Sequence, residues 1–251
     1  MLHKQWYYVC TSPELSSKQR KTFKVLGEPL LCFRNTQGHP VVLEDRCPHR
    51  NVPLSMGTLR KGCITCPYHG WTFNGEGTCV HIPSLAEEDR IPNTAKVTSY
   101  PVREQNNMIW MFFGSPKDAQ ATSPPLVPEM DTWPFVAKEH IFEADIEAAA
   151  ESLIDPYHIA FTHSNSIGTL LGAIEDKDQN PNFNIQVVDD GLIGEFQRDN
   201  NASFFEKMYF GNTPTVHVKY RFFYPNLSRL EIAFPRRTLL ILEHMMKVDE
   251  T

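Results

Sequence analysis

Residues 47–71 contain Cys47-Pro48-His49-Arg50, a spacer, and Cys66-Pro67-Tyr68-His69-Gly70-Trp71. Each of the two motifs offers one thiol and one imidazole, separated by one residue in the first motif and by two residues in the second. Thiolates and imidazoles are both good ligands of transition metals, so each motif can hold one side of a small metal centre. We therefore take this stretch as the organising feature of the chain.

The two motifs resemble the signature of the Rieske non-haem iron oxygenases. In a Rieske centre, two His replace two Cys on one iron of a [2Fe–2S] cluster. Respiratory relatives carry one extra Cys in each loop, and these form a disulfide; Val52 and Tyr68 stand at those places here, as in the oxygenase and ferredoxin branch. The resemblance implies that the cluster ligands are Cys47, His49, Cys66 and His69.

A structural zinc site is the alternative interpretation of the same stretch. Cys63 and Cys66 form a Cys-x-x-Cys pair, and Cys47 and Cys79 would complete a set of four thiolates. This alternative leaves both imidazoles of the stretch without a role. A small buried side chain is the simpler explanation of Cys63.

Composition excludes several classes of protein. With 251 residues, 41% of them hydrophobic, the chain can form one large or two modest domains. A net charge of −6 argues against a general nucleic-acid binder. Six Cys in a chain of this length are typical of a reducing compartment, and we find neither a signal peptide nor an apolar run of the ~20 residues that span a bilayer. We expect a cytoplasmic protein without a membrane segment.

The N-terminal part of the sequence predicts a small all-β domain over residues 1–116. Apolar runs at residues 30–33, 41–43 and 108–113 indicate strands, and the sequence around Asn74-Gly75 indicates a hairpin turn. Proline then clusters at residues 116, 124, 125, 128 and 134, which predicts an extended connector over residues 117–139. Residues 140–251 form the remaining domain.

The C-terminal part predicts an α+β layout. Ala and Glu over residues 143–154 favour a helix, which should end or kink at Asp155, just before Pro156. Strands are indicated at residues 183–188, 192–196, 216–224, 230–234 and 238–248. A helix followed by an antiparallel sheet is similar to the helix-grip, START-like catalytic domain of the oxygenase family, here in partial form. The aromatic residues at 204–205 and 222–224 could line a substrate pocket, although strand aromatics are more often core.

A second metal site is implied by Asp155-Pro156-Tyr157-His158, which continues to His163. This stretch matches the family pattern Asp-x-x-His-x-x-x-x-His for a mononuclear Fe(II), in which two His and one carboxylate occupy one face of the iron. On an ideal helix these two His point in different directions, so they converge only if the backbone bends, and Pro156 can start such a bend. Taken alone, the two His would be read as core or solvated residues.

Two acidic residues near this site have candidate roles. By resemblance, Asp155 is not an iron ligand but hydrogen-bonds both an iron ligand and a cluster His, such as His69, of a neighbouring subunit, which implies a homotrimer. Alternatively, Asp155 caps a helix that starts at Pro156. Glu151 stands where related enzymes keep a polar group near the iron, and otherwise is a surface residue.

The resemblance leaves the third iron ligand unassigned. In the family it is a carboxylate in a later helix, but 88 residues follow His163 and end in an apparent strand. We therefore expect a chain truncated at its C-terminus relative to the family. The preferred function is the terminal oxygenase component, which takes electrons from NAD(P)H through a reductase or ferredoxin and uses O₂ on an aromatic or polycyclic substrate. The alternative is an electron carrier with an incomplete oxygenase domain.

Overall fold

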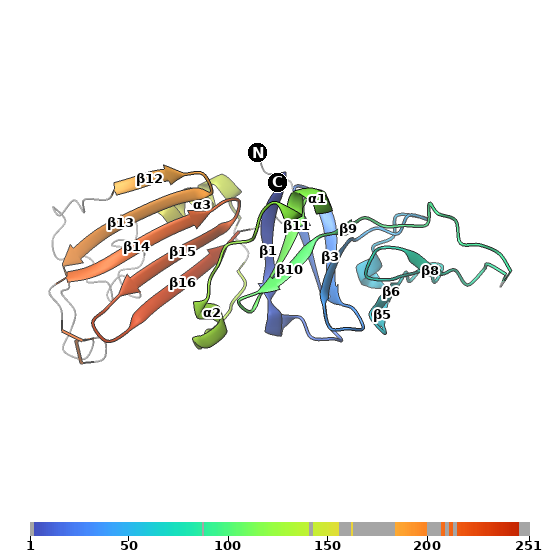
Figure 1. The fold of residues 1–251 in the computed structure, drawn as a ribbon, viewed down its shortest axis with the longest axis horizontal. Coiled ribbons are helices and arrows are strands. Elements are labelled where there is room, and N and C mark those ends of the chain that lie inside the picture. Colours follow the sequence, from blue (N-terminus) through green and yellow to red (C-terminus); the bar gives the residue numbers. More distant parts are fainter. Residues whose placement is uncertain are drawn as a thin grey trace. The chain divides into compact units, whose positions relative to one another are not determined.

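The computed structural model describes residues 3–86, 88–140, 143–155, 162, 184–199, 207–208, 211–212 and 215–245 (Figure 1). The chain divides into two compact units, with the boundary between residues 141 and 142. Each unit is described by itself below. The domain limits derived from the sequence (1–116, 117–139 and 140–251) stay a prediction. Among the described residues, no helix combines the length and the apolar composition that a membrane span requires.

In its described part, the first unit contains three antiparallel sheets (Figure 1). The first sheet consists, in spatial order, of β1 (Gln5–Thr11), β11 (Met108–Phe113) and β10 (Val102–Gln105). The second consists of β2 (Arg20–Val25), β3 (Glu28–Arg34), β4 (Pro40–Glu44) and β9 (Ser99–Tyr100). The third consists of β5 (Thr58–Arg60), β6 (Cys63–Thr65), β7 (Thr72–Phe73) and β8 (Cys79–His81). Short 3₁₀ turns lie at Ser12–Glu14 and Leu54–Met56.

Two hydrophobic cores hold this unit together. One joins β3 and β11 through residues such as Leu30, Ile109 and Met111, all fully buried. The other lies under the third sheet and includes Leu54 and Ile64 together with residues of both ligand loops. The structure confirms the strands predicted at residues 30–33, 41–43 and 108–113. Each of these apolar runs supplies residues to the two cores. The hairpin turn at Asn74-Gly75 is confirmed as well.

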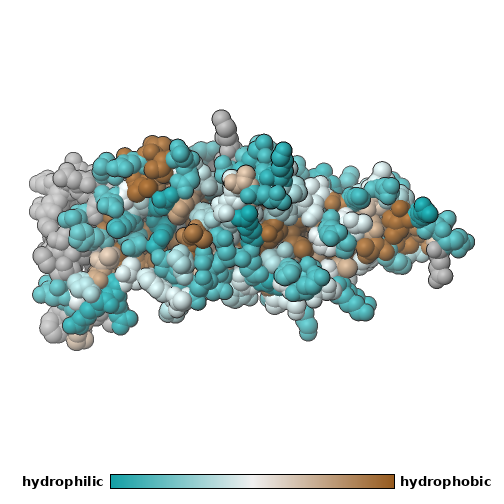
Figure 2. Space-filling view, in the orientation of Figure 1, coloured by the Kyte–Doolittle hydropathy of each residue, from teal (hydrophilic) through white to brown (hydrophobic). Residues whose placement is uncertain are grey.

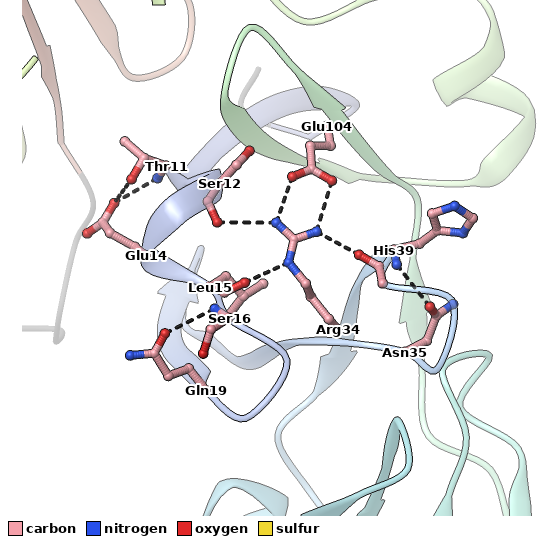
Figure 3. Close-up of polar contacts among 11 residues, drawn as sticks. Thr11, Ser12, Glu14, Leu15, Ser16, Gln19, Arg34, Asn35, His39 and Glu104 are labelled. Atoms are coloured by element: carbon pink, nitrogen blue, oxygen red, sulfur yellow. Dashed lines mark hydrogen bonds and ion pairs between the residues drawn. The ribbon is translucent and has the colours of Figure 1, made fainter. Parts of the chain in front are cut away.

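Arg34 connects segments of the first unit that lie far apart in the sequence (Figure 3). Its guanidinium donates two hydrogen bonds to the Glu104 carboxylate, at 2.9 and 2.7 Å. It also donates to three backbone carbonyls, those of Ser12, Leu15 and Gly38. One side chain at the end of β3 therefore holds the 12–15 turn, the 35–38 turn and β10 together.

The sequence predicts an extended proline-rich connector, but the connector is only partly extended. It contains two short helices, α1 (Pro116–Gln120) and α2 (Glu129–Thr132). The Ser115 hydroxyl accepts a hydrogen bond from the Asp118 amide at 3.2 Å, and Pro116 occupies the first helical position. Because proline is well tolerated at that position, the residue that predicted extension instead starts a helix.

The second unit contains α3 (Ile146–Ile154) and a five-stranded antiparallel sheet (Figure 1). The sheet consists, in order, of β12 (Asn184–Val188), β13 (Gly191–Asp199), β14 (Thr215–Phe223), β15 (Leu227–Ala233) and β16 (Thr238–His244). The predicted helix and strands thus occur, with ends shifted by a few residues. At the edge strand β12, Ile185 and Val187 are exposed, and hydrophobic atoms gather over this strand in Figure 2.

Candidate metal centre

The two motifs of residues 47–71 form loops with the same backbone hydrogen bonds. In the first loop, which follows β4, the Cys47 amide donates to the Val52 carbonyl at 2.9 Å and the Asn51 amide donates to the Cys47 carbonyl at 2.8 Å. In the second loop, between β6 and β7, the Cys66 amide donates to Trp71 at 2.8 Å and the Gly70 amide donates to Cys66 at 3.1 Å. Both loops are therefore built on the same five-residue spacing.

The fifth residue of each loop has a positive φ. Asn51 has φ 57° and Gly70 has φ 73°, a left-handed conformation in which Asn and Gly are enriched. At Gly70, an added Cβ would lie 2.7 Å from Cγ of Pro83. The sequence-based reading did not single out either residue, although an Asn and a Gly at matching places after two Cys-Pro pairs are a signal that could have identified them.

Polar contacts close the base of each loop. The buried Asp45 carboxylate accepts hydrogen bonds from the Ser55 amide at 2.7 Å and from the Ser55 hydroxyl at 2.6 Å. At the other loop, the Thr65 and Thr72 hydroxyls lie 3.0 Å apart in a hydrogen bond. The sequence alone did not indicate a role for Asp45. Its carboxylate fixes the return of the first loop into the turn at Leu54–Met56.

The two predicted thiol ligands lie together at the edge of a hydrophobic core. Cys47 and Cys66 are 2% and 3% exposed. Burial raises the pKa of the Cys47 thiol to about 11, and the neighbouring Cys66 thiol contributes to this rise. An apolar site does not favour thiolates by itself, whereas a bound metal deprotonates a coordinating thiol.

The two predicted imidazole ligands also lie together, but at the surface. The His49 and His69 rings are 4.7 Å apart between centroids, and both residues are exposed. The Trp71 indole stacks on His49 at 4.9 Å with an angle of 6° between the planes. Tyr68, which is 61% exposed, packs against His69 at 3.9 Å. Two aromatic side chains thus flank the imidazole pair.

This donor set fits a [2Fe–2S] cluster with mixed ligands, because such a cluster needs one Cys pair and one His pair on separate irons. The zinc alternative needs four ligands around one ion. Among the residues that the structure describes, no three His, Cys, Asp or Glu side chains are placed to share a metal ion. Cys79 instead donates its thiol to the His81 carbonyl at 3.4 Å. The four cysteines of the zinc alternative therefore do not converge.

The second predicted site is only partly described. Glu151 lies in α3, and Asp155 is the first residue after the end of this helix. Both residues are exposed, and the Asp155 amide donates to the Glu151 carbonyl at 3.0 Å. Asp155 has ψ 111°, an extended conformation that the following proline favours. His158 and His163 lie outside the described residues. Their relation to Asp155 and Glu151 stays a prediction.

Comparisons with known proteins agree with this geometry. Residues 5–101 match the family model of the Rieske [2Fe-2S] domain. The chain is 33% identical over 168 residues to the toluene-4-sulfonate monooxygenase system iron-sulfur subunit TsaM1 of Comamonas testosteroni, covering 65% of this chain and 47% of that protein. It is 34% identical over 158 residues to the 4beta-methylsterol monooxygenase of Methylococcus capsulatus, covering 61% of this chain and 42% of that protein. The chain thus spans about half, or less, of the length of these relatives.

A solved structure of dicamba monooxygenase bound to 3,6 dichlorosalicylic acid is also similar. Its TM-score is 0.77 at 25% identity, over 96% of this chain and 72% of that chain. The chain therefore carries a Rieske [2Fe–2S] domain. It is a homologue of the Rieske non-haem iron oxygenases, an oxidoreductase family whose members include the named monooxygenases above.

Proposed function

We propose that this chain is the terminal oxygenase component of a Rieske non-haem iron system. The observation that carries the proposal is the pairing within one Rieske domain of two buried thiols with two exposed imidazoles. In this proposal, Cys47 and Cys66 hold one iron of the cluster, and His49 and His69 hold the other. When bound, the cluster supplies one-electron transfer.

The protein groups around this centre have distinct tasks. The core around the two thiols excludes water from the cysteine side, while the imidazole side faces the surface, where a redox partner can approach. Exposed basic residues near the loops suit an acidic ferredoxin or reductase that draws electrons from NAD(P)H. These residues are Arg46, Arg50, Arg60 and Lys61. A solvated basic face is the simpler alternative for them.

His158 and His163 would bind the mononuclear Fe(II), whose chemistry when bound is the activation of O₂. Asp155 would hydrogen-bond an iron ligand and His69 of a neighbouring subunit in a homotrimer, and Glu151 would lie near the iron. The third iron ligand is not assigned. The substrate, an aromatic or polycyclic molecule, would lie against the face of the β12–β16 sheet that carries Leu192, Phe222 and Leu230. Phe223 alternates to the other face, and Tyr224 lies in the turn after β14. Phe204 and Phe205 lie outside the described residues.

The relatives bear names that point to very different substrates, a sulfonate and a sterol. Hydroxylation, dihydroxylation and oxidative demethylation are all compatible with the proposal. The chain's relatives therefore support the oxygenase class and leave the substrate open.

Metal analysis of anaerobically prepared protein tests the proposal. We expect about three irons to two acid-labile sulfides per chain, and no stoichiometric zinc. The variant His158→Ala should contain about two irons to two sulfides, keep a reducible cluster and lose O₂ consumption. A zinc-containing, colourless protein would refute the proposal. A wild-type ratio of about two to two, unchanged by His158→Ala, would instead indicate an electron carrier with an incomplete oxygenase domain.

A further inference from the structure

The β12–β16 sheet has one predominantly apolar face. Directly opposite residues in neighbouring strands share a face, and alternate residues point to opposite faces. The register pairs Leu192 with Phe222 and Leu230 with Ile241. By the same register and alternation, this face also carries Ile185, Val187, Val218, Ile232 and Leu239.

Two polar side chains, Tyr220 and Ser228, interrupt this face, and a third, Asn226, lies in the turn that joins β14 to β15. Tyr220 is 5% exposed, Ser228 is 0% exposed and Asn226 is 2% exposed. Ser228 pairs with Phe222, whose neighbour on the same face is Tyr220, and Asn226 precedes Ser228 by two positions along the chain. Ser228 and Tyr220 are therefore neighbours on this face, and Asn226 is next to Ser228 at the end of the sheet.

None of these side chains has found a hydrogen-bond partner. The Tyr220 hydroxyl, the Ser228 hydroxyl and both polar atoms of the Asn226 amide are buried without one. Burial raises the pKa of Tyr220, and the nearby Ser228 hydroxyl opposes that rise. Buried polar groups in native proteins are nearly always paired, so such a cluster calls for a partner that brings its own polar atoms.

The charges around the cluster define that partner. Lys219, Arg221 and Arg229 alternate onto the opposite face of β14 and β15. In the described strands, Arg198 is the cationic residue whose register position is on the apolar face. It pairs with Val216, and the position of Val216 is roughly 13 Å along β14 from that of Tyr220.

The Glu243 carboxylate adds to this picture, because it acts electrostatically on Tyr220 and raises its pKa. Glu243 also pairs with Ser228 in the register, so its position is on the same face, and an anion placed here would meet a carboxylate. A neutral oxygen that accepts hydrogen bonds, such as that of a hydroxyl or a carbonyl, would meet the Tyr220 and Ser228 hydroxyls without that repulsion.

We propose that Tyr220, Ser228 and Asn226 form a subsite that binds an uncharged hydroxyl or carbonyl group of an otherwise apolar substrate. This inference rests on the proposed function, in that it takes the apolar face of the sheet as the substrate side. It assigns the chain to neutral substrates, in contrast to aromatic carboxylates or sulfonates.

Equilibrium dialysis of the full chain with three matched probes tests the subsite: 2-naphthol, naphthalene and 2-naphthoate. We expect 2-naphthol to bind at least about tenfold more tightly than either other probe, because only it offers a neutral group to the three side chains. In Tyr220→Phe and in Ser228→Ala, the preference for 2-naphthol over naphthalene should fall several-fold, while naphthalene affinity stays within about twofold. Tyr100→Phe, which removes a phenol from the first unit, should leave all three affinities unchanged.

Equal binding of the three probes, no binding of any probe, or equal changes of all affinities in both variants would overturn the subsite. The last result would mean that the polar cluster holds only water. Binding requires no electron transfer, so this test is independent of turnover. A chain that prefers 2-naphthol but has no mononuclear iron would support the subsite and refute the proposed oxygenase. A chain that has the mononuclear iron but no preference for 2-naphthol would support the oxygenase and refute the subsite.

Discussion

Arg34 shows how much of the first unit depends on one side chain. Its five hydrogen bonds need a planar guanidinium, since a lysine ammonium has three donors and a different geometry. We predict that Arg34→Lys lowers the free energy of unfolding by about 1–3 kcal/mol. Arg20→Lys is the matched control: Arg20 donates a single bond, to the Gly57 carbonyl, and the change should cost below about 1 kcal/mol. Urea unfolding followed by circular dichroism measures both, and equal losses would contradict this role of Arg34.

The partner of Arg34 predicts a pH dependence. Hydrogen bonds from Arg34 hold the pKa of Glu104 below its usual value of 4.5, although partial burial opposes this. A carboxyl whose pKa is lower in the folded state than in the unfolded state stabilises the fold above its unfolded pKa. This contribution is lost as the pH falls through the folded pKa.

Glu104→Gln should therefore be less stable than wild type at pH 7, and the gap should narrow as the pH falls below about 4.5. Unfolding midpoints in urea at several pH values give the difference directly. A gap that stays constant from neutral to acid pH would mean that the charge of Glu104 contributes nothing.

At the scale of the element, the two ligand loops have the same backbone hydrogen bonds and differ in the number of residues between the Cys and the His. The matching left-handed residues Asn51 and Gly70 make a paired test. Gly70→Ala adds a Cβ at an unfavourable φ and 2.7 Å from Pro83, which should cost about 1–3 kcal/mol and displace the adjacent His69. Asn51→Gly keeps the left-handed conformation accessible and should leave the centre intact.

Visible absorbance and iron content of the two purified variants test this pair. We expect loss of cluster from Gly70→Ala and wild-type content in Asn51→Gly. Full cluster content in Gly70→Ala would show that the loop tolerates the side chain by moving Pro83.

At the scale of the whole molecule, the first unit has its own cores and contains all four proposed cluster ligands. We predict that residues 1–140 expressed alone fold and bind about two irons and two sulfides. Iron and sulfide analysis of this fragment, beside the full chain, measures this. A fragment without iron that is nevertheless folded by circular dichroism would place part of the cluster's stability in the second unit.

The sequence predicted what local patterns specify. Alternating and continuous apolar runs located the strands, and the Cys and His spacings located the two ligand loops. It missed contacts between distant segments, such as Arg34 with Glu104 and Asp45 with Ser55, because a polar residue does not reveal its partner from its position in the chain. It also misjudged the connector, since Pro116 is as compatible with the first turn of a helix as with an extended chain.

The stacking of the Trp71 indole on His49 also has an optical consequence. Indole fluorescence is quenched by energy transfer to a strongly absorbing neighbour, and an iron–sulfur cluster ligated by His49 would be such a neighbour at very short range. Trp71 would then be dark while the cluster is present and emit once it is lost. Emission compared between the wild type and Trp71→Phe would follow cluster loss in real time, without any added dye.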